Sequence, residues 1–407
     1  MPFMQAWLVI IRVQDKNGQP VERRFSLGLA QPQALDAEER LLAPPSLGIE
    51  TLTSGPGKGG SRAPVGSIQL AGIDRGLGTL HDLVWAEGDL DLYYAPDGDA
   101  VTALADMTLT ARLTTSGIRE DSNGRLTIEL RDRSWLLDRK LALTRYAGTG
   151  GAEGPAELKD RPKPWAIGPQ TAVEPVLVDQ PGLIYQLHAR SIAGIDLVTD
   201  KGVALINGGD IETLVGPGAG FAELQSFDLT DAQWAGTYIT WNAGGMFRLA
   251  RKPVGLVVAD FRGDAAGGYV ERPGAVIRRV MEALYDGPAV TLDEVALNAL
   301  DAAFPHPVKL FTDREGPRVS DWIETVAAAA GAVWWLDWQG RLTARLLDPA
   351  AMAQPIEDFR IAEISRGPSW PRRKSVVLGY RVVSRVHSAD ELAEITADDI
   401  TYSDGTP

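Results

Sequence analysis

The sequence of 407 residues contains no cysteine and only four histidines. The absence of cysteine excludes disulfide bonds and thiolate metal sites, and it favours folding in a reducing compartment. The histidines, His81, His188, His306 and His387, lie far apart, so no histidine-pair metal motif is present. Any one of them could act as a general base, but a packed or solvated role is favoured for each.

Long hydrophobic runs are also missing. The apolar stretches at residues 7–11 and 327–336 are far shorter than the roughly 20 residues that a membrane-spanning helix needs. The first of them also lacks the basic flank of a secretory signal. We therefore expect no membrane anchor.

Basic residues are fewer than acidic ones: the chain has 40 Lys and Arg against 54 Asp and Glu, which gives a formal net charge of −14. Phosphate repulsion makes so acidic a chain a poor candidate for general nucleic-acid binding. The compact basic run at residues 371–374, Pro-Arg-Arg-Lys, precedes a predicted strand. We interpret this run as a solvated strand entry rather than a phosphate contact.

The length of the chain predicts several domains. Short β-branched and aromatic stretches alternate with Gly- and Pro-rich turns up to residue 273, where helical periodicity begins. The predicted fold class is mainly β and multidomain, with an α+β domain. The predicted parts are an N-terminal β domain (1–145) with a long loop (31–64), a Gly/Pro-rich joint (146–168), a second β domain (169–265), an α+β domain (266–350) and a C-terminal strand segment (351–407).

Both β domains are expected to consist of short strands joined by tight turns. In the first, the dipeptides Asn17-Gly18, Asp97-Gly98 and Asn123-Gly124 predict hairpins, and we expect a short helix near residues 78–84. Its expected strands are 6–13, 21–27, 67–70, 90–94, 107–114 and 125–130. Those of the second domain are 172–178, 184–187, 195–199, 203–206, 237–241 and 255–261, with turns at Gly208-Gly209, Gly216-Pro217-Gly218 and Gly244-Gly245.

Three helices and a hairpin are predicted in the α+β domain. Residues 274–284 carry apolar side chains at the spacing of one helical face. Thr291 and Glu294 form a predicted capping box for a helix over 292–304. Ser320 is predicted to cap a helix over 321–330 that Gly331 ends, and a hairpin over 332–347 turns at Gln339-Gly340.

No motif predicts chemistry at a site. The SGPGKGGS segment around Gly57-Lys58 lacks the first glycine and the hydroxyl residue of a phosphate loop. Asp89, Asp91 and Asp97 do not follow the ligand order of a calcium loop, because Tyr93 stands at a ligand position. We therefore predict no enzyme activity, no catalytic residue, no cofactor and no metal.

Tryptophan is abundant, with 11 residues. Trp322 on a predicted helix precedes Trp334, Trp335 and Trp338 on the predicted hairpin, where strand alternation sends Trp334 and Trp335 to opposite faces. We interpret the group as a domain or subunit interface, because indoles are enriched at interface anchors. A sugar-stacking surface is the alternative. The candidate interface residues are Trp322, Trp334, Trp335, Trp338, Trp165 and Tyr380.

Seven segments carry a recognisable pattern: LRDRSWLLDRKL (130–141), RYAGTGG (145–151), LKDRPKPWAIG (158–168), PVLVD (175–179), LIYQLH (183–188), GTYITWNAGGMFRLA (236–250) and VVLGYR (376–381). Together they resemble segments of baseplate and tail-tip proteins from long-tailed, siphovirus-like bacteriophages and prophages. The resemblance covers most of residues 65–390 and rests on structural rather than catalytic motifs.

The resemblance implies a baseplate hub, built of small antiparallel β-barrel or sandwich domains of tail-hub type. Such a structural virion protein closes the distal end of the tail tube and is assembled in the host cytoplasm. The implied partners are further copies of the chain in a homo-oligomer, with a trimer favoured, and the tape-measure, distal tail, other baseplate and receptor-binding proteins. DNA would meet the protein only in transit through the lumen, where an acidic lining would limit adhesion.

Two other functions stay open at this point. A hexameric distal-tail ring protein would differ from a hub only in symmetry and neighbours, and a carbohydrate-binding protein would use the tryptophans for stacking. Relatives of the resembling kind continue past the strand equivalent to residues 376–386. We therefore expect either a truncated form or a C-terminal strand completed by another chain. Residues 1–64 carry no family pattern.

Overall fold

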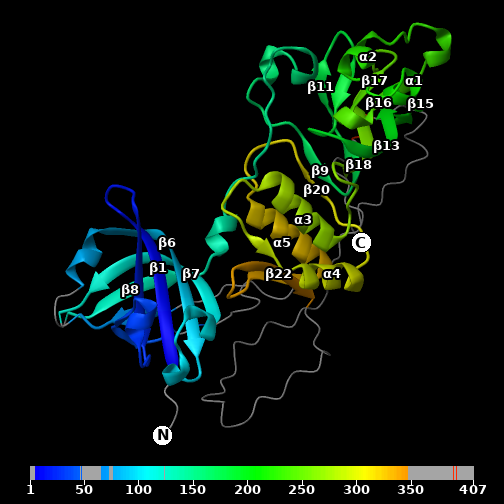
Figure 1. Cartoon of the computed structure of the whole chain (residues 1–407). Helices are drawn as coiled ribbons and strands as arrows, with labels where there is room; N and C mark the ends of the chain where they lie inside the picture. Colours follow the sequence, from blue (N-terminus) through cyan, green and yellow to red (C-terminus); the bar gives the residue numbers. More distant parts are fainter. Residues whose placement is uncertain are drawn as a thin grey trace. The chain divides into compact units, whose positions relative to one another are not determined.

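A computed structural model describes residues 5–45, 47, 66–72, 77–122, 124–346, 388 and 391. The chain divides into two compact units. Unit 1 comprises Met1–Arg139, Gly287–Leu300 and Gly331–Leu347, and unit 2 comprises Lys140–Asp286, Asp301–Ala330 and Asp348–Pro407. Strands dominate both units (Figure 1), which confirms the prediction of a mainly β, multidomain chain with a few helices. The predicted domain boundaries stay predictions.

An eight-stranded sheet makes up most of unit 1, in the order β3-β2-β1-β6-β7-β8-β5-β4. Neighbouring strands run antiparallel except β2 and β3. The two end strands, β3 and β4, are separated in the chain by Arg40 alone, so the sheet curls into a near-closed barrel (Figure 1). The strands are β1 (Ala6–Asp15), β2 (Pro20–Leu27), β3 (Glu38–Glu39), β4 (Leu41–Ala43), β5 (Ser67–Leu70), β6 (Leu83–Ala95), β7 (Thr108–Glu120) and β8 (Leu126–Arg131).

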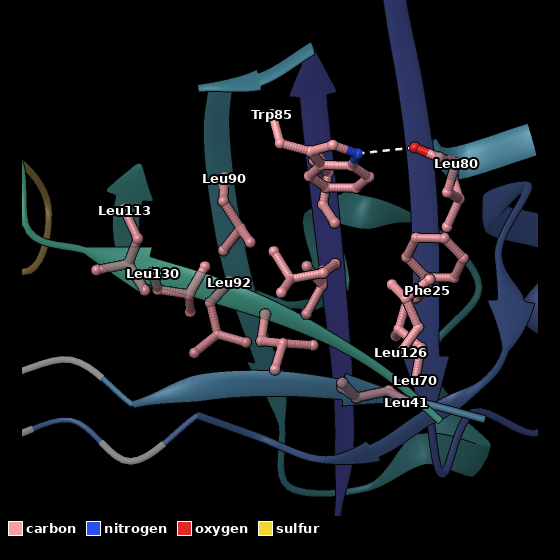
Figure 2. Packing of buried hydrophobic residues seen from close by; sticks show 14 of the residues in the cluster. Phe25, Leu41, Leu70, Leu80, Trp85, Leu90, Leu92, Leu113, Leu126 and Leu130 are labelled. Carbon is pink, nitrogen blue, oxygen red and sulfur yellow. Dashed lines mark hydrogen bonds between the residues drawn. The ribbon is translucent and has the colours of Figure 1, made fainter. Parts of the chain in front are cut away.

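The barrel interior is filled by aliphatic side chains from its strands, together with Phe25 and Trp85 (Figure 2). The indole Nε1 of Trp85 donates a hydrogen bond of 2.8 Å to the carbonyl of Leu80, which satisfies the polar edge of a buried ring. Strand β1 is apolar on both faces because Leu8 and Ile10 point away from this interior into a second cluster. That cluster includes side chains from residues 28–37 and 96–107, which cover the outer face of β1.

Turn predictions in unit 1 are mixed. Gly18, with φ at +78°, makes the predicted β1–β2 hairpin, and strands β7 and β8 pair across the predicted turn at Gly124. The tight hairpin predicted at Asp97-Gly98 is wrong, because Asp97 instead accepts a hydrogen bond from the backbone N–H of Asp99 and caps a 3₁₀ turn. The 3₁₀ turns of unit 1 are η1 (Pro32–Leu35), η2 (Gly78–Asp82), η3 (Gly98–Ala100), η4 (Leu104–Asp106) and η5 (Ser134–Leu137).

The predicted long loop over 31–64 is also wrong in its first part, where η1, β3 and β4 form. The register explains this, since Phe25 and Ser26 on β2 pair with Glu38 and Glu39. Residues 48–65 lie outside the described part. The short helix expected near residues 78–84 is present as the turn η2.

A three-stranded sheet in the order β19-β22-β21 completes unit 1. Gly340, with φ at +76°, makes the predicted turn between its two long strands. The predicted helix cap at Thr291 is wrong, because Thr291 lies in β19. The carboxylate of Asp293 instead accepts a hydrogen bond from the backbone N–H of Ala296. Helix α4 therefore begins two residues later than predicted. The elements are β19 (Thr291–Leu292), α4 (Glu294–Ala303, beginning in unit 1), β21 (Ala332–Leu336) and β22 (Arg341–Leu346).

Unit 2 contains two larger sheets, in the orders β10-β18-β13-β14 and β11-β12-β17-β16-β15, and a short β20-β9 pair. Apolar side chains of both larger sheets share one core, which includes Val198, Phe247 and Phe261. The strands are β9 (Trp165–Ile167), β10 (Pro169–Val173), β11 (Val176–Asp179), β12 (Ile184–Gln186), β13 (Ile192–Asp200), β14 (Val203–Ala204), β15 (Ile206–Asp210), β16 (Thr237–Trp241), β17 (Met246–Leu249), β18 (Val257–Asp264) and β20 (Leu310–Thr312).

A second core in unit 2 joins the five-stranded sheet to two short helices and to the Gly/Pro-rich joint. Tyr146 and Leu158 of the joint are buried in it, and Glu153 bonds both Lys163 and the backbone N–H of Ala147. The joint is therefore packed against the sheet. The elements around it are α1 (Ile211–Leu214), α2 (Phe221–Ser226), η6 (Gly151–Glu153), η7 (Ala156–Leu158), η8 (Ala232–Trp234) and η9 (Asn242–Gly244).

Four predictions for unit 2 need correction. The expected strand over 203–206 is two strands, because β14 ends at Ala204 and β15 begins at Ile206 in the other sheet. The expected strand over 172–178 is two strands, because Ala172 adopts a positive φ of +51° in a bulge and the chain passes from one sheet to the other. Gly208 and Gly209 lie within β15 rather than in a turn. Helices α1 and α2 were not expected, since each is shorter than two turns and shows no helical period.

The long helices of unit 2 match the prediction closely. Helix α3 (Pro273–Leu284) begins with a proline at its first position and buries the predicted apolar face. Helix α5 (Val319–Ala330) starts two residues before the prediction, because the Asp321 carboxylate accepts from the backbone N–H of Arg318 and Ser320 lies inside the helix. Gly331 ends it with φ at +67°. The predicted strand over 375–386 lies outside the described residues.

Candidate functional site

Two of the four candidate interface tryptophans on α5 and the following hairpin are buried, and two are half-buried. Trp322 on α5 is 5% exposed and Trp334 on β21 is 7% exposed. Trp335 and Trp338 are half-buried, and Trp338 packs against the barrel interior of unit 1. The carbonyl of Trp338 also accepts from the backbone N–H of Arg112 at 2.5 Å. These positions do not support a sugar-stacking platform built from all four indoles.

The other two candidate residues lie elsewhere. Trp165 on β9 is 3% exposed, and its ring contacts the His188 imidazole edge-on, with centroids 4.7 Å apart. Tyr380 lies outside the described part of the chain. Trp334, Trp335 and Trp338 are therefore brought together on one hairpin, whereas Trp165 belongs to a buried site of unit 2.

An aliphatic edge, defined here as Leu197, Val203, Ile206, Leu214 and Val215, is exposed on unit 2. Strand β14 ends one sheet and β15 ends the other, with Leu205 alone between them, so the chain crosses between the two sheets at their edges. Ile206 is 66% exposed and Val215 is 55% exposed. Helix α1 follows β15 directly and carries Leu214. The sequence predicted one strand over 203–206 and a turn at Gly208-Gly209, so it missed β15 and did not single out the exposed aliphatic side chains.

A buried ionic junction, defined as His188, Arg190, Asp264 and Arg279, lies inside unit 2. Asp264 is the last residue of β18 and is fully buried. Arg190 donates to both of its oxygens, with Nε to Oδ1 at 2.7 Å and Nη2 to Oδ2 at 2.8 Å. Arg279 on α3 donates from Nη1 to Oδ2 and from Nη2 to the carbonyl of Gly268 at 3.0 Å. The junction therefore connects α3 to the sheets.

His188 is the fourth member and is also fully buried. Its Nδ1 accepts a hydrogen bond of 3.0 Å from the backbone N–H of Ala166 on β9. Its Nε2 lies 3.4 Å from Asp264 Oδ1, in a direction that falls short of a hydrogen bond. The guanidinium of Arg190 stacks over the Trp165 ring, 4.7 Å from its centroid.

Two pKa values in the junction are shifted downward, for different reasons. Burial opposes ionisation of Asp264, but the nearby His188 ring and the hydrogen bonds from Arg190 and Arg279 outweigh it and hold the pKa of that carboxyl well below its usual range. Burial is the main cause that lowers the pKa of His188. The junction therefore holds an ionised carboxylate between two guanidiniums beside a neutral imidazole at neutral pH.

The acidic residues tested as calcium ligands serve other purposes. Asp91 on β6 pairs with Arg12 at 2.8 Å, and Asp89 lies 3.4 Å from Arg133. Across the ranges described, no group of three or more His, Asp or Glu side chains is placed to hold a metal ion. None of the described helices is long and apolar enough to cross a membrane.

The open depression beside the Gly/Pro-rich joint mixes both signs of charge. Arg145, Lys159, Arg161 and Arg314 line it together with three acidic side chains, and Arg145 already pairs with Glu315. This mixture favours no single class of ligand.

Comparisons with known proteins give little similarity. No protein-family model matches the chain, and no curated protein matches it. Among solved structures, the chain is similar to one from a "virion of native gene transfer agent (GTA) particle", at 11% sequence identity and a TM-score of 0.18. That match covers 65% of this chain and 80% of the other. A TM-score of this size is too low to argue a shared fold.

Proposed function

We propose that the chain is a structural virion protein, a non-catalytic subunit of the hub that closes the distal end of a bacteriophage tail tube. Its proposed neighbours are the tape-measure, distal tail and receptor-binding proteins, and its proposed location is the tail tip. The proposal builds on the tail-protein resemblance of the seven segments between residues 130 and 381. A near-closed barrel and a pair of sheets around one core suit a rigid assembly part.

The aliphatic edge is the observation that carries the assembly role. Ile206 and Val203 stand on terminal strands of two sheets, where backbone groups on the outer side lack a neighbouring strand in the described fold. Natural proteins usually protect such edges with charge, proline or a covering segment. An edge that instead displays aliphatic side chains is suited to pairing with another subunit. We propose a second copy of the chain as the occupant, in a closed ring.

The proposed number of copies rests on the tail-hub resemblance. A trimer is favoured, and a six-copy ring at the distal tail is the alternative. The strongly acidic chain, with a formal net charge of −14, would repel DNA in transit through such a ring.

The test is the mass of the purified chain, measured by light scattering at several concentrations. We expect a stable trimer for the natural sequence and loss of that mass for Ile206→Glu, because a carboxylate would be buried without a partner in the interface. Val295→Glu is the matched control, since Val295 is 80% exposed but belongs to unit 1. A natural chain that stays monomeric at every concentration would contradict self-assembly through this edge.

A further inference from the structure

The buried ionic junction lies beside strand β9, and the backbone of β9 approaches that of β18 very closely. A side chain at Gly263 on β18 would place its Cβ 2.5 Å from the carbonyl oxygen of Ala166, so only glycine permits this contact. Strand β9 pairs in turn with β20, from Trp165↔Thr312 to Ile167↔Leu310. The His188 ring lies beside this contact and bonds the backbone of Ala166 directly.

The hydrogen bond from the Ala166 N–H fixes the tautomer of His188. Nδ1 accepts from the Ala166 N–H, so Nδ1 carries no proton and the neutral ring carries its proton on Nε2. That proton lies on the side of Asp264 Oδ1, 3.4 Å from Nε2. The packed edge of Trp165 limits rotation of the ring into another arrangement.

A second proton cannot be accommodated in this arrangement. It would bind Nδ1 and point at the Ala166 N–H, which places two donors against each other and removes the hydrogen bond. It would also add a positive charge beside two guanidiniums that share one carboxylate, within a site whose His188 and Asp264 side chains are fully buried. The protonated ring is therefore compatible only with an opened junction.

We propose that His188 is an acid-sensitive latch, whose protonation releases strand β9, together with its partner β20, from its close contact with β18 at Gly263. The charged groups that face the ring are Asp264 from β18, Arg190 from the segment after β12 and Arg279 from α3. Strand β9 presents Trp165 and no charged group to it. Glu282 lies 3.5 Å from Arg279 Nε at the exposed side of the junction and partly balances its charge.

The size of the effect follows from proton linkage. The opened state takes up one proton with the usual histidine pKa of about 6.5, whereas the closed state resists it. The opening equilibrium therefore grows as the pH falls below that value, by about tenfold between pH 7.5 and pH 5.5. The lowered pKa of His188 in the closed state, caused by burial, agrees with this direction.

Hydrogen exchange of the Ala166 amide tests the proposal in the full-length chain. We expect the protection factor of this amide, which is corrected for the intrinsic exchange rate, to fall about tenfold between pH 7.5 and pH 5.5. The measurement is made under conditions in which the opened junction closes again faster than the amide exchanges. In His188→Asn an amide oxygen replaces Nδ1 as the acceptor, and the asparagine side chain does not titrate. Protection of the Ala166 amide in this variant should therefore stay constant over that pH range. His306→Asn, at an exposed histidine of the same unit, should behave as the natural chain does.

A flat protection profile in the natural chain, or an equal decrease in His188→Asn, would overturn the latch. Nitrogen-15 spectra of the His188 ring provide a second measurement that needs no variant. At pH 7.5 they should show an unprotonated Nδ1 and a protonated Nε2. Titration of the ring near pH 6.5 with Ala166 still protected would show that protonation and opening are not coupled.

Discussion

Asp264 and Arg279 form a buried ion pair that ties the end of strand β18 to helix α3. Oδ2 of Asp264 accepts a hydrogen bond from Nη1 of Arg279, and Nη2 of the same guanidinium donates to the carbonyl of Gly268. Both side chains are at least 94% removed from solvent, with relative exposures of 0% and 6%. Since neither charge can be hydrated in place, each depends on the other for its stability.

Replacing Asp264 by Asn should destabilise unit 2 by about 3–5 kcal/mol, because two guanidiniums would keep their charges without a carboxylate. The measurement is the free energy of unfolding from urea titration, followed by tryptophan fluorescence. Asp196→Asn is the control. Asp196 pairs with Arg262 at 3.2 Å, but both are about half exposed, so the loss should be below about 1 kcal/mol. Equal losses in the two variants would contradict the role of burial.

The same carboxyl should make unit 2 sensitive to strong acid. Its pKa in the folded chain lies below the value of about 3.9 in an unfolded chain. Asp264 therefore contributes stability that is fully present above about pH 4 and is lost as the pH falls toward the folded pKa. Urea midpoints at pH 5 and pH 3 should differ more in the natural chain than in Asp264→Asn. Identical differences would assign the acid sensitivity to other carboxylates.

Gly98→Ala should destabilise unit 1 by about 1–3 kcal/mol. Gly98 is buried, and an added Cβ would overlap the carbonyl oxygen of Gly28. Gly78→Ala is the matched control, because nothing lies within 4 Å of its added Cβ and its φ is not positive. Thermal melting by circular dichroism should show a lower midpoint for Gly98→Ala only, and a shift of equal size in both would refute the steric explanation.

Lys201→Asn should stabilise unit 2 by about 0.5–1 kcal/mol. Lys201 and Gly202 connect β13 to β14 with φ values of +52° and +81°, a pair of left-handed conformations in which Asn-Gly is the favoured sequence. Lys252→Asn, at an exposed residue with ordinary φ, controls for the loss of charge. Chemical unfolding of both variants gives the comparison, and a gain in the control alone would count against the turn argument.

Trp85→Phe should cost about 1–3 kcal/mol, because the indole's buried hydrogen bond to the carbonyl of Leu80 is lost and the smaller ring leaves a cavity in the barrel. Trp335→Phe, at a half-buried indole of the same unit, should cost less. Urea titrations of the two variants measure the difference. If Trp335→Phe proved the more damaging change, the buried hydrogen bond would not be what stabilises this part of the core.

Local patterns in the sequence predicted the elements that depend on local forces. The apolar face of α3 follows from its helical period, and the Asn17-Gly18 hairpin follows from positive φ at glycine. The mainly β class followed from many short alternating segments. The cap of α4 was misassigned because Thr291 is drawn into β19 by pairing with Arg341, a contact between distant residues.

The buried junction had no comparable signal. Arg279 follows Arg278 on a helix, and Asp264 ends a strand beside a glycine, so each looks like an ordinary surface charge in the sequence. Only the tertiary fold brings them within reach of His188, whose sequence neighbours do not mark it. The aliphatic edge was missed for a related reason, since exposure of Ile206 depends on where the sheet ends.

The single residue between β3 and β4 has a consequence for self-association. Arg40 carries the chain from one end of the eight-stranded sheet to the other, and its backbone carbonyl accepts from Ala71 at 2.8 Å. A proteolytic cut at Arg40 would remove the covalent link between the two end strands, whose outer sides could then recruit strands from other molecules. One residue thus keeps together the two ends of a sheet that, in the part of the chain described, its own hydrogen bonds do not close.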